Sequence, residues 1–199
     1  MPVSGMTALN GLRDAGKIQP EQKVLIIGAA GGVGTYAVQL AKAFGAVVTG
    51  VCSRSKAELV WAIGGDEVID YTREDFTDGT RRFDLILDTA GRRPLSQLRR
   101  ALTPQGTLVI VGGEGGDRWL GGFQRQIFAP LRSRFSEQKL LGLMYKQRQQ
   151  DLLTLKDLIE AGKLTPVIDR TFPLKEAPQA IRYLEQGHAR GKVVVTVEK

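Results

Sequence analysis

A glycine-rich turn at residues 28–34 places the strongest constraint on how this chain can fold. Its sequence is Gly-Ala-Ala-Gly-Gly-Val-Gly, and it directly follows an apolar segment at residues 23–27. Behind the turn, apolar residues recur with the spacing of an α-helix until Gly45, a natural helix end. Glycine tolerates the backbone angles that a tight reversal requires. We therefore predict a strand, a tight turn and a helix, the first crossover of an α/β sheet.

The same turn predicts a binding site for a diphosphate. The first backbone N–H groups of a helix lack partners within the helix, and the helix dipole favours an anion beside them. Gly31 and Gly32 carry no side chain, so a diphosphate could touch the backbone there. Turns in α/β domains that bind nothing also use glycine. The strand, turn and helix context nevertheless favours a dinucleotide site.

The end of the second expected strand, near Cys52, distinguishes between two dinucleotides. An NAD site usually has Asp or Glu there, about 20 residues beyond the turn, to accept hydrogen bonds from the ribose. This chain has Ser53, followed by Arg54 and Lys56. A serine and two cations can bind a 2′-phosphate, so the sequence predicts NADP(H). The alternative is that both cations only solvate a loop.

The composition excludes several other classes of protein. With 199 residues the chain is long enough for a substantial core. Its single cysteine rules out a disulfide framework within the chain. Its single histidine makes a zinc site implausible, because catalytic zinc needs three protein ligands and structural zinc usually four. We expect Cys52 to be a small buried hydrophobe, His188 to lie in a loop, and no metal to be bound.

The net charge of +7 raises the question of a nucleic-acid partner. The arginines lie in separate pairs at 81–82, 92–93 and 99–100, without interleaved aromatic residues or a nucleic-acid motif. We expect a solvated basic surface that attracts an anionic cofactor, and no nucleic-acid partner. No signal-peptide pattern is present, and the longest apolar stretch, residues 24–33, is too short to span a bilayer. A cytoplasmic protein is therefore expected.

A basic amphipathic stretch at residues 119–135 has two interpretations. Its aromatic and aliphatic residues alternate with three arginines, so it could touch a membrane surface. Any packed helix also shows one apolar face. We favour core packing, or a cover over the substrate side, and expect no membrane contact.

Further apolar segments alternate with helical ones along the chain. We expect strands at 67–71, 83–88, 106–111 and 139–144, and helices at about 55–63, 94–102, 121–134 and 148–161. This alternation predicts an α/β fold with a doubly wound parallel sheet, the Rossmann class. Beyond it, strands at 167–172 and 192–197 flank a helix at about 176–184. This strand-helix-strand tail would need strand partners if it does not join the main sheet.

Ligands of such sheets bind outside the carboxyl ends of the strands. Thr89 follows one expected strand, and Gly112 and Gly113 follow another. The two glycines leave room for a flat ring, although they could equally form only a turn. Tyr71 ends the third strand near the expected adenosine end, where its hydroxyl could reach a phosphate.

Two enzyme families have glycine spacings that fit the turn. Short-chain dehydrogenases also require Tyr-x-x-x-Lys, and none of the four tyrosines here is followed by a lysine at that distance. The chain instead resembles the cofactor-binding half of the medium-chain dehydrogenase/reductases, in the zinc-independent quinone oxidoreductase branch. The matching segments are 4–8 (SGMTA) with Leu12, 24–35 (VLIIGAAGGVGT), 39–42 (QLAK), 64–71 (GGDEVIDY), 83–88 (FDLILD) and 191–194 (GKVV).

The resemblance implies a role for each matching site residue. The pyrophosphate would contact the glycine turn, the adenosine phosphate would contact the basic cluster, and the nicotinamide would lie at the ends of two later strands. The residues are, in that order, Gly31, Gly32 and Val33; Ser53, Arg54, Lys56 and Tyr71; and Thr89, Gly112 and Gly113, with Lys192 as a further cofactor contact. No residue has the character of a general acid or nucleophile, so no catalytic residue is predicted.

The resemblance also implies a domain organisation and an activity. Residues 1–22 would form a lead-in helix from a catalytic domain that this sequence lacks, 23–163 the NADP-binding Rossmann domain, and 164–199 a tail that returns to the catalytic domain. Family members transfer a hydride from NADPH to a quinone or to an activated alkene or carbonyl, such as an enone. They often form homodimers through the edge strand that corresponds to 139–144.

One alternative is an NADP(H)-binding module without turnover of its own, because only one wall of the substrate pocket is expected here. A methyltransferase is disfavoured, since that class usually has an acidic residue at the end of the second strand.

Overall fold

The computed structural model describes residues 2–111, 137–144 and 148–197. Six parallel strands form the main sheet in the order β3-β2-β1-β4-β5-β6. These are β1 (Lys23–Ile27), β2 (Val47–Cys52), β3 (Glu67–Asp70), β4 (Phe83–Asp88), β5 (Leu102–Ile110) and β6 (Lys139–Gly142). The chain builds outward from β1 to β3 and then crosses back to β4, so the order reverses beside β1. The predicted doubly wound Rossmann sheet is confirmed.

Helices cover both faces of this sheet. They are α1 (Pro2–Leu9), α2 (Gly34–Ala43), α3 (Ala57–Ala62), α4 (Leu95–Arg100) and α6 (Gln149–Glu160). A further helix, α7 (Ala177–Glu185), belongs to the tail. Val24 and Ile26 of β1 pack in a core cluster with α1, α2 and α6, whereas Leu25 and Ile27 pack in a second cluster with α4. Burial on both faces explains why the strands are almost continuously apolar. In the described part of the chain, no helix has the length and apolar character needed to cross a membrane.

Some element ends differ from those expected. β5 already begins at Leu102 rather than at 106, and its pairing with β4 shifts register between Phe83 and Leu85. Pro104 lies in this irregular start, and proline cannot donate to a strand ladder. The apolar pattern therefore did not reveal the first residues of β5. β6 ends at Gly142 rather than at 144. The helix expected at 121–134 and the amphipathic stretch at 119–135 lie outside the described residues.

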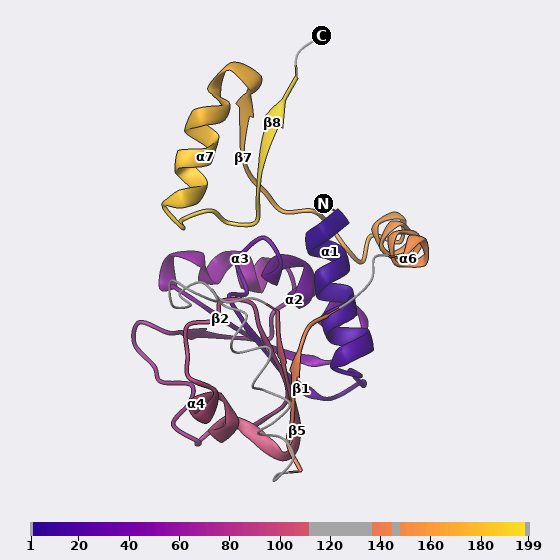
Figure 1. Cartoon of the computed structure of the whole chain (residues 1–199), viewed down its shortest axis with the longest axis vertical. Coiled ribbons are helices and arrows are strands. Elements are labelled where there is room, and N and C mark those ends of the chain that lie inside the picture. Colours follow the sequence, from indigo (N-terminus) through magenta and orange to yellow (C-terminus); the bar gives the residue numbers. More distant parts are fainter. Residues whose placement is uncertain (1, 112–136, 145–147, 198–199) are drawn as a thin grey trace.

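The tail has the expected strand-helix-strand order, and its strands pair with each other. β7 (Ile168–Pro173) and β8 (Lys192–Thr196) form a separate two-stranded parallel sheet with α7 between them in the chain (Figure 1). Hydrogen bonds join the tail to the Rossmann sheet, and two sites of contact lie at α2 and at the glycine turn. The buried Gln39 amide donates to Thr165 O at 3.0 Å and accepts from Thr165 N at 2.7 Å. Gly191 N donates to Ala30 O at 3.0 Å, within the glycine turn.

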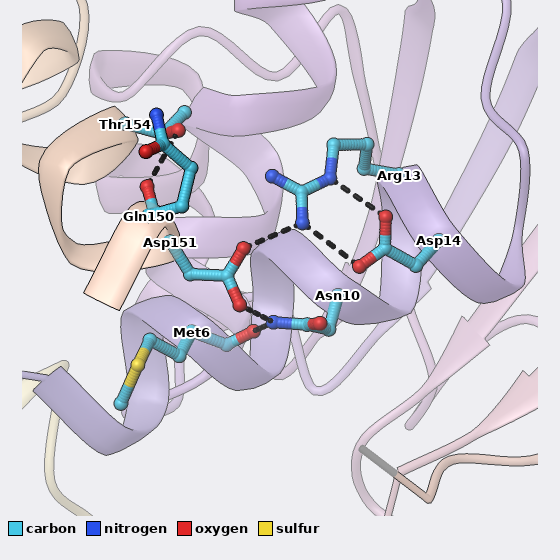
Figure 2. A network of polar contacts seen from close by, with 7 residues as sticks. All are labelled: Met6, Asn10, Arg13, Asp14, Gln150, Asp151 and Thr154. Carbon is cyan, nitrogen blue, oxygen red and sulfur yellow. Dashed lines mark hydrogen bonds and ion pairs between the residues drawn. The ribbon is translucent and has the colours of Figure 1, made fainter. Parts of the chain in front are cut away.

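A polar cluster holds the N-terminal helix against α6 (Figure 2). Asp151 of α6, only 1% exposed, accepts from Arg13 Nη2 at 2.6 Å and from Asn10 Nδ2 at 3.2 Å. Asn10 and Arg13 lie in a π-helical turn, Asn10–Ala15, that continues α1. Arg13 also donates to the Asp14 carboxylate at 2.7 and 2.8 Å, and this pairing lowers the pKa of Asp14. The cluster fixes the position of α1, including its residue Ser4.

Replacing the shared acceptor should loosen this contact. In Asp151→Ala, Arg13 and Asn10 lose a buried partner, so we expect the free energy of unfolding to fall by about 1–3 kcal/mol. Urea denaturation followed by circular dichroism measures the change. Lys156→Ala breaks an exposed ion pair with Glu160 on the same helix and should leave the unfolding free energy unchanged. Similar losses in the two variants would contradict the assignment.

Candidate functional site

A cavity of about 440 Å³ opens beside the glycine turn, at the carboxyl ends of β1, β2 and β4. Its walls come from the glycine turn, the segments that follow β2, β3 and β4, helix α1 and the tail. This is the point where the strand order reverses, and ligands of doubly wound sheets bind in the crevice at such a point. The volume falls within the range of small-molecule sites.

Most of the site residues expected from the sequence line this cavity. They are Gly31, Gly32, Val33, Ser53, Lys56, Tyr71 and Thr89. Lys192 lies directly behind the turn, since a Cβ at Gly32 would be 2.8 Å from Lys192 Nζ. Arg54 is exposed and is not among the lining residues. Gly112 and Gly113 lie outside the described residues. The roles of these residues in binding stay predictions.

The cavity also includes residues that the sequence did not identify. These are Ser4, Phe76, Arg92, Arg93, Gly187 and Ala189, together with apolar residues at the strand ends. Arg92 and Arg93 follow the carboxyl end of β4, so the strand-end rule could have found them, but their pairing suggested a solvated surface. Ser4, Gly187 and Ala189 come from distant segments and carry no local signal.

The glycines of the turn have different structural roles. Gly28 has φ +82°, and a Cβ there would lie 2.6 Å from Thr89 Oγ1, which donates to Ile27 O at 2.7 Å. A Cβ at Gly34 would lie 2.0 Å from Gly28 O, so only glycine lets α2 start this close to β1. A Cβ at Gly31 would meet only Gly28 O, at 3.3 Å. Gly31 therefore faces open space on the cavity side.

Several backbone donors at this turn lack acceptors within the described protein. Gly31 N donates to Gly28 O and Thr35 N donates to Gly31 O, both at 3.0 Å. Between them, the N–H groups of Gly32, Val33 and Gly34 have no acceptor among the described residues. Of these three residues, Gly32 and Val33 line the cavity at the start of α2. This arrangement can bind an anionic oxygen without any side chain.

The charged side chains in the described cavity wall are all positive. Among the described lining residues, Lys56, Arg92 and Arg93 are cationic and none is acidic. Lys56 Nζ donates to the backbone oxygens of Gly187 and Ala189, and burial lowers the pKa of this lysine, as does the nearby charge of Arg190. Arg93 lies 3.7 Å from Asp75 Oδ1. The wall therefore favours an anionic ligand.

Two Asp-x-Thr turns present the aromatic residues of the cavity. Tyr71 and Phe76 each stand between an aspartate and a threonine. In both turns the aspartate Oδ1 accepts from the threonine N–H and, at 2.7 Å, from its hydroxyl, which orders the segment. These hydrogen bonds lower the pKa of Asp70 and Asp75. Both carboxylates thus stabilise the loop and lie outside the cavity lining.

Cys52 is buried, as expected, and forms part of the cavity wall. Burial, followed by the negative charge of Asp70 beside it on β3, raises the pKa of its thiol to about 11. Because the thiolate is the reactive form of cysteine, this environment protects the side chain from alkylation.

This predicts slow labelling in the folded state. Relative to an ordinary thiol with pKa 9.0, a pKa of about 11 lowers the thiolate fraction at pH 8 about 100-fold. Iodoacetamide labelling followed by mass spectrometry should therefore be at least about 100-fold slower for the folded chain than for the chain in urea. Similar rates in the two states would show that Cys52 is accessible and ionised.

Comparisons with known proteins agree with this architecture. A family model described as zinc-binding dehydrogenase matches residues 63–195. The mouse NAD(P)H oxidoreductase RTN4IP1, mitochondrial, is 35% identical over 215 residues, covering 99% of this chain and 54% of that protein. An NAD-dependent alcohol dehydrogenase of Saccharolobus solfataricus is 36% identical over 201 residues, covering 96% and 55%. The structure of the quinone oxidoreductase from Coxiella burnetii superposes with a TM-score of 0.82 at 30% identity, covering 100% and 59%.

The chain thus spans a little over half the length of these proteins. Their names differ in the cofactor, and one of them is mitochondrial, so NADP(H) specificity and a cytoplasmic location stay predictions for this chain. No group of three or more His, Cys, Asp or Glu side chains that could hold a metal occurs in the described ranges. The expected lack of a metal also stays a prediction.

Proposed function

Because the chain belongs to the zinc-binding dehydrogenase family, as the cofactor-binding half of a medium-chain dehydrogenase/reductase, we propose that the cavity beside its glycine turn binds NADP(H). One observation carries this proposal. The free N–H groups of Gly32 and Val33 open into a cavity whose described wall has three cations and no carboxylate. Such a site fits a ligand with several phosphates.

The diphosphate would lie on Gly31, Gly32 and Val33. The open space beside Gly31 leaves room for it, and the ammonium of Lys192 lies directly behind Gly32. Lys192 Nζ also donates to Ser4 Oγ, so helix α1 and the tail meet at this point. Burial lowers the pKa of Lys192, and an anion nearby would favour its charged form.

The adenosine end would lie between the segments that follow β2 and β3. Ser53 and Lys56 offer donors there, and Tyr71 and Phe76 offer aromatic surface. No carboxylate occupies the end of β2, where an NAD site usually has one for the ribose hydroxyls. Arg54 would contribute only long-range charge, because it is exposed and outside the lining. These features support a preference for the 2′-phosphate.

The nicotinamide would lie near Thr89, with Gly112 and Gly113 as expected neighbours. When bound, NADPH supplies the hydride, and we propose a quinone or an activated alkene or carbonyl as the acceptor. The quinone oxidoreductase from Coxiella burnetii supports this substrate class. The residues of this chain would bind and orient the cofactor, and none of those described is proposed as a general acid.

The proposed domain organisation follows the resemblance. Residues 23–163 would form the cofactor-binding domain, with 1–22 and 164–199 as connections to a catalytic domain. A homodimer through the edge strand expected at 139–144 stays a prediction, and β6 does lie at the edge of the described sheet.

Cofactor choice is the direct test. We expect NADPH to bind at least about tenfold more tightly than NADH, because a charge-assisted hydrogen bond to the 2′-phosphate contributes roughly 1.5–3 kcal/mol. Isothermal titration of each dinucleotide measures the ratio. In Gly31→Val the side chain would fill the diphosphate space, and the one close contact of its Cβ would be Gly28 O at 3.3 Å, so both affinities should fall together. Tighter binding of NADH, or unchanged affinities in Gly31→Val, would refute the proposal.

Turnover separates hydride transfer from binding alone. With only one wall of the substrate pocket proposed here, we expect this chain to bind NADPH and to oxidise it with a soluble quinone at no more than the rate without protein. Loss of absorbance at the NADPH wavelength measures the rate. Quinone-dependent oxidation above that background would mean that these residues suffice for catalysis and would exclude the binding-only alternative.

A further inference from the structure

Lys56 joins two parts of the chain that are far apart in sequence. It ends the short 3₁₀ turn Arg54–Lys56 after β2, and its Nζ donates to Gly187 O at 3.3 Å and Ala189 O at 3.1 Å. Lys56, Gly187 and Ala189 all line the same cavity. The connection from α7 to β8 that carries these two carbonyls passes above α3 and α2 in Figure 1. The tail therefore forms one wall of the cavity and contacts Lys56, one of the three cations in that wall.

The loop has anchors that do not depend on Lys56. Gly187 N donates to Leu184 O at 2.9 Å, and Gly187 has φ +70°, which ends α7. Arg190 N donates to Asp169 Oδ2, and Gly191 N donates to Ala30 O, both at 3.0 Å. The two carbonyls are thus presented to the cavity by a loop that is fixed on both sides.

Neutral acceptors orient this lysine without cancelling its charge. Lys42 shows the contrast, because both oxygens of Asp66 lie 2.8 Å from its Nζ. Lys56 has no such carboxylate partner among the described residues, and an ammonium has three donors, of which the carbonyls take two. Burial and the neighbouring charge of Arg190 lower the pKa of Lys56 by more than the charge of Asp169 raises it. An anion bound there would relieve this repulsion.

We propose that the tail loop positions Lys56 to receive the 2′-phosphate, so that NADP(H) binding and docking of the tail strengthen each other. The inference rests on the proposed function and assigns its specificity to Lys56 rather than to Arg54. Gly187 and Ala189 act as positioning residues through their backbone oxygens. By linkage, a cofactor with the 2′-phosphate stabilises the docked loop more than one without it.

A matched pair of glycines tests the positioning role. Gly187 and Gly162 have φ values of +70° and +69°, and a Cβ at either would meet nothing within 4 Å. Alanine imposes the same backbone strain at both, but only Gly187 holds Lys56. We expect the NADPH-to-NADH affinity ratio of the full chain to fall about threefold or more in Gly187→Ala and to stay unchanged in Gly162→Ala. Lys56→Met should lower it about tenfold and Arg54→Met should not.

Hydrogen exchange on the unmodified chain tests the coupling without relying on a variant. At saturation with each dinucleotide, the amides of Arg190 and Gly191 should exchange about fivefold more slowly with NADPH than with NADH. In Lys56→Met this difference should disappear. Equal or faster exchange with NADPH, or equal ratios in the two glycine variants, would overturn the inference while leaving the proposed function intact. A wild-type chain that does not prefer NADPH would refute the proposed function itself.

Discussion

The close contact between Gly34 and Gly28 O is the constraint on which the candidate site depends. With no room for a Cβ, α2 starts directly against the end of β1. The N–H groups of Gly32 and Val33 are therefore left without acceptors in the described structure, at the point where the strand order reverses. The ends of β2 and β4 flank this point because both strands pair with β1. A local steric requirement thus determines where a ligand can bind.

The sequence predicted those parts of the structure that follow from local rules. Apolar runs and the glycine turn are local signals, and they located β1, β2 and α2 and predicted the doubly wound class of the sheet. The start of β5 was missed because Pro104 interrupts the pattern at an irregular register. Arg92 and Arg93 were interpreted as surface cations because a pair of arginines looks the same in sequence whether it faces solvent or a cavity. The structure shows that the loop after β4 places both arginines in the cavity wall.

Residues that reach the cavity from distant segments were beyond such rules. Ser4 arrives because Asp151 holds the N-terminal helix against α6, and Gly187 arrives because the tail returns to the glycine turn at Ala30. Both contacts depend on pairs of residues more than a hundred positions apart. A single sequence contains the residues of such a pair but no sign that they meet, so the composition of the wall required the structure.

The tail is better regarded as part of the cavity than as an appendage to the sheet. A two-stranded sheet is only marginally stable by itself, so β7 and β8 depend on their connections to the rest of the chain. These connections are the hydrogen bonds of Thr165 with Gln39, of Gly191 with Ala30 of the glycine turn, of the Gly187 and Ala189 carbonyls with Lys56, and of Lys192 with Ser4. Of these partners, Ala30, Lys56 and Ser4 line the cavity. A ligand that contacts the glycine turn and Lys56 would therefore contact residues that also hold the tail.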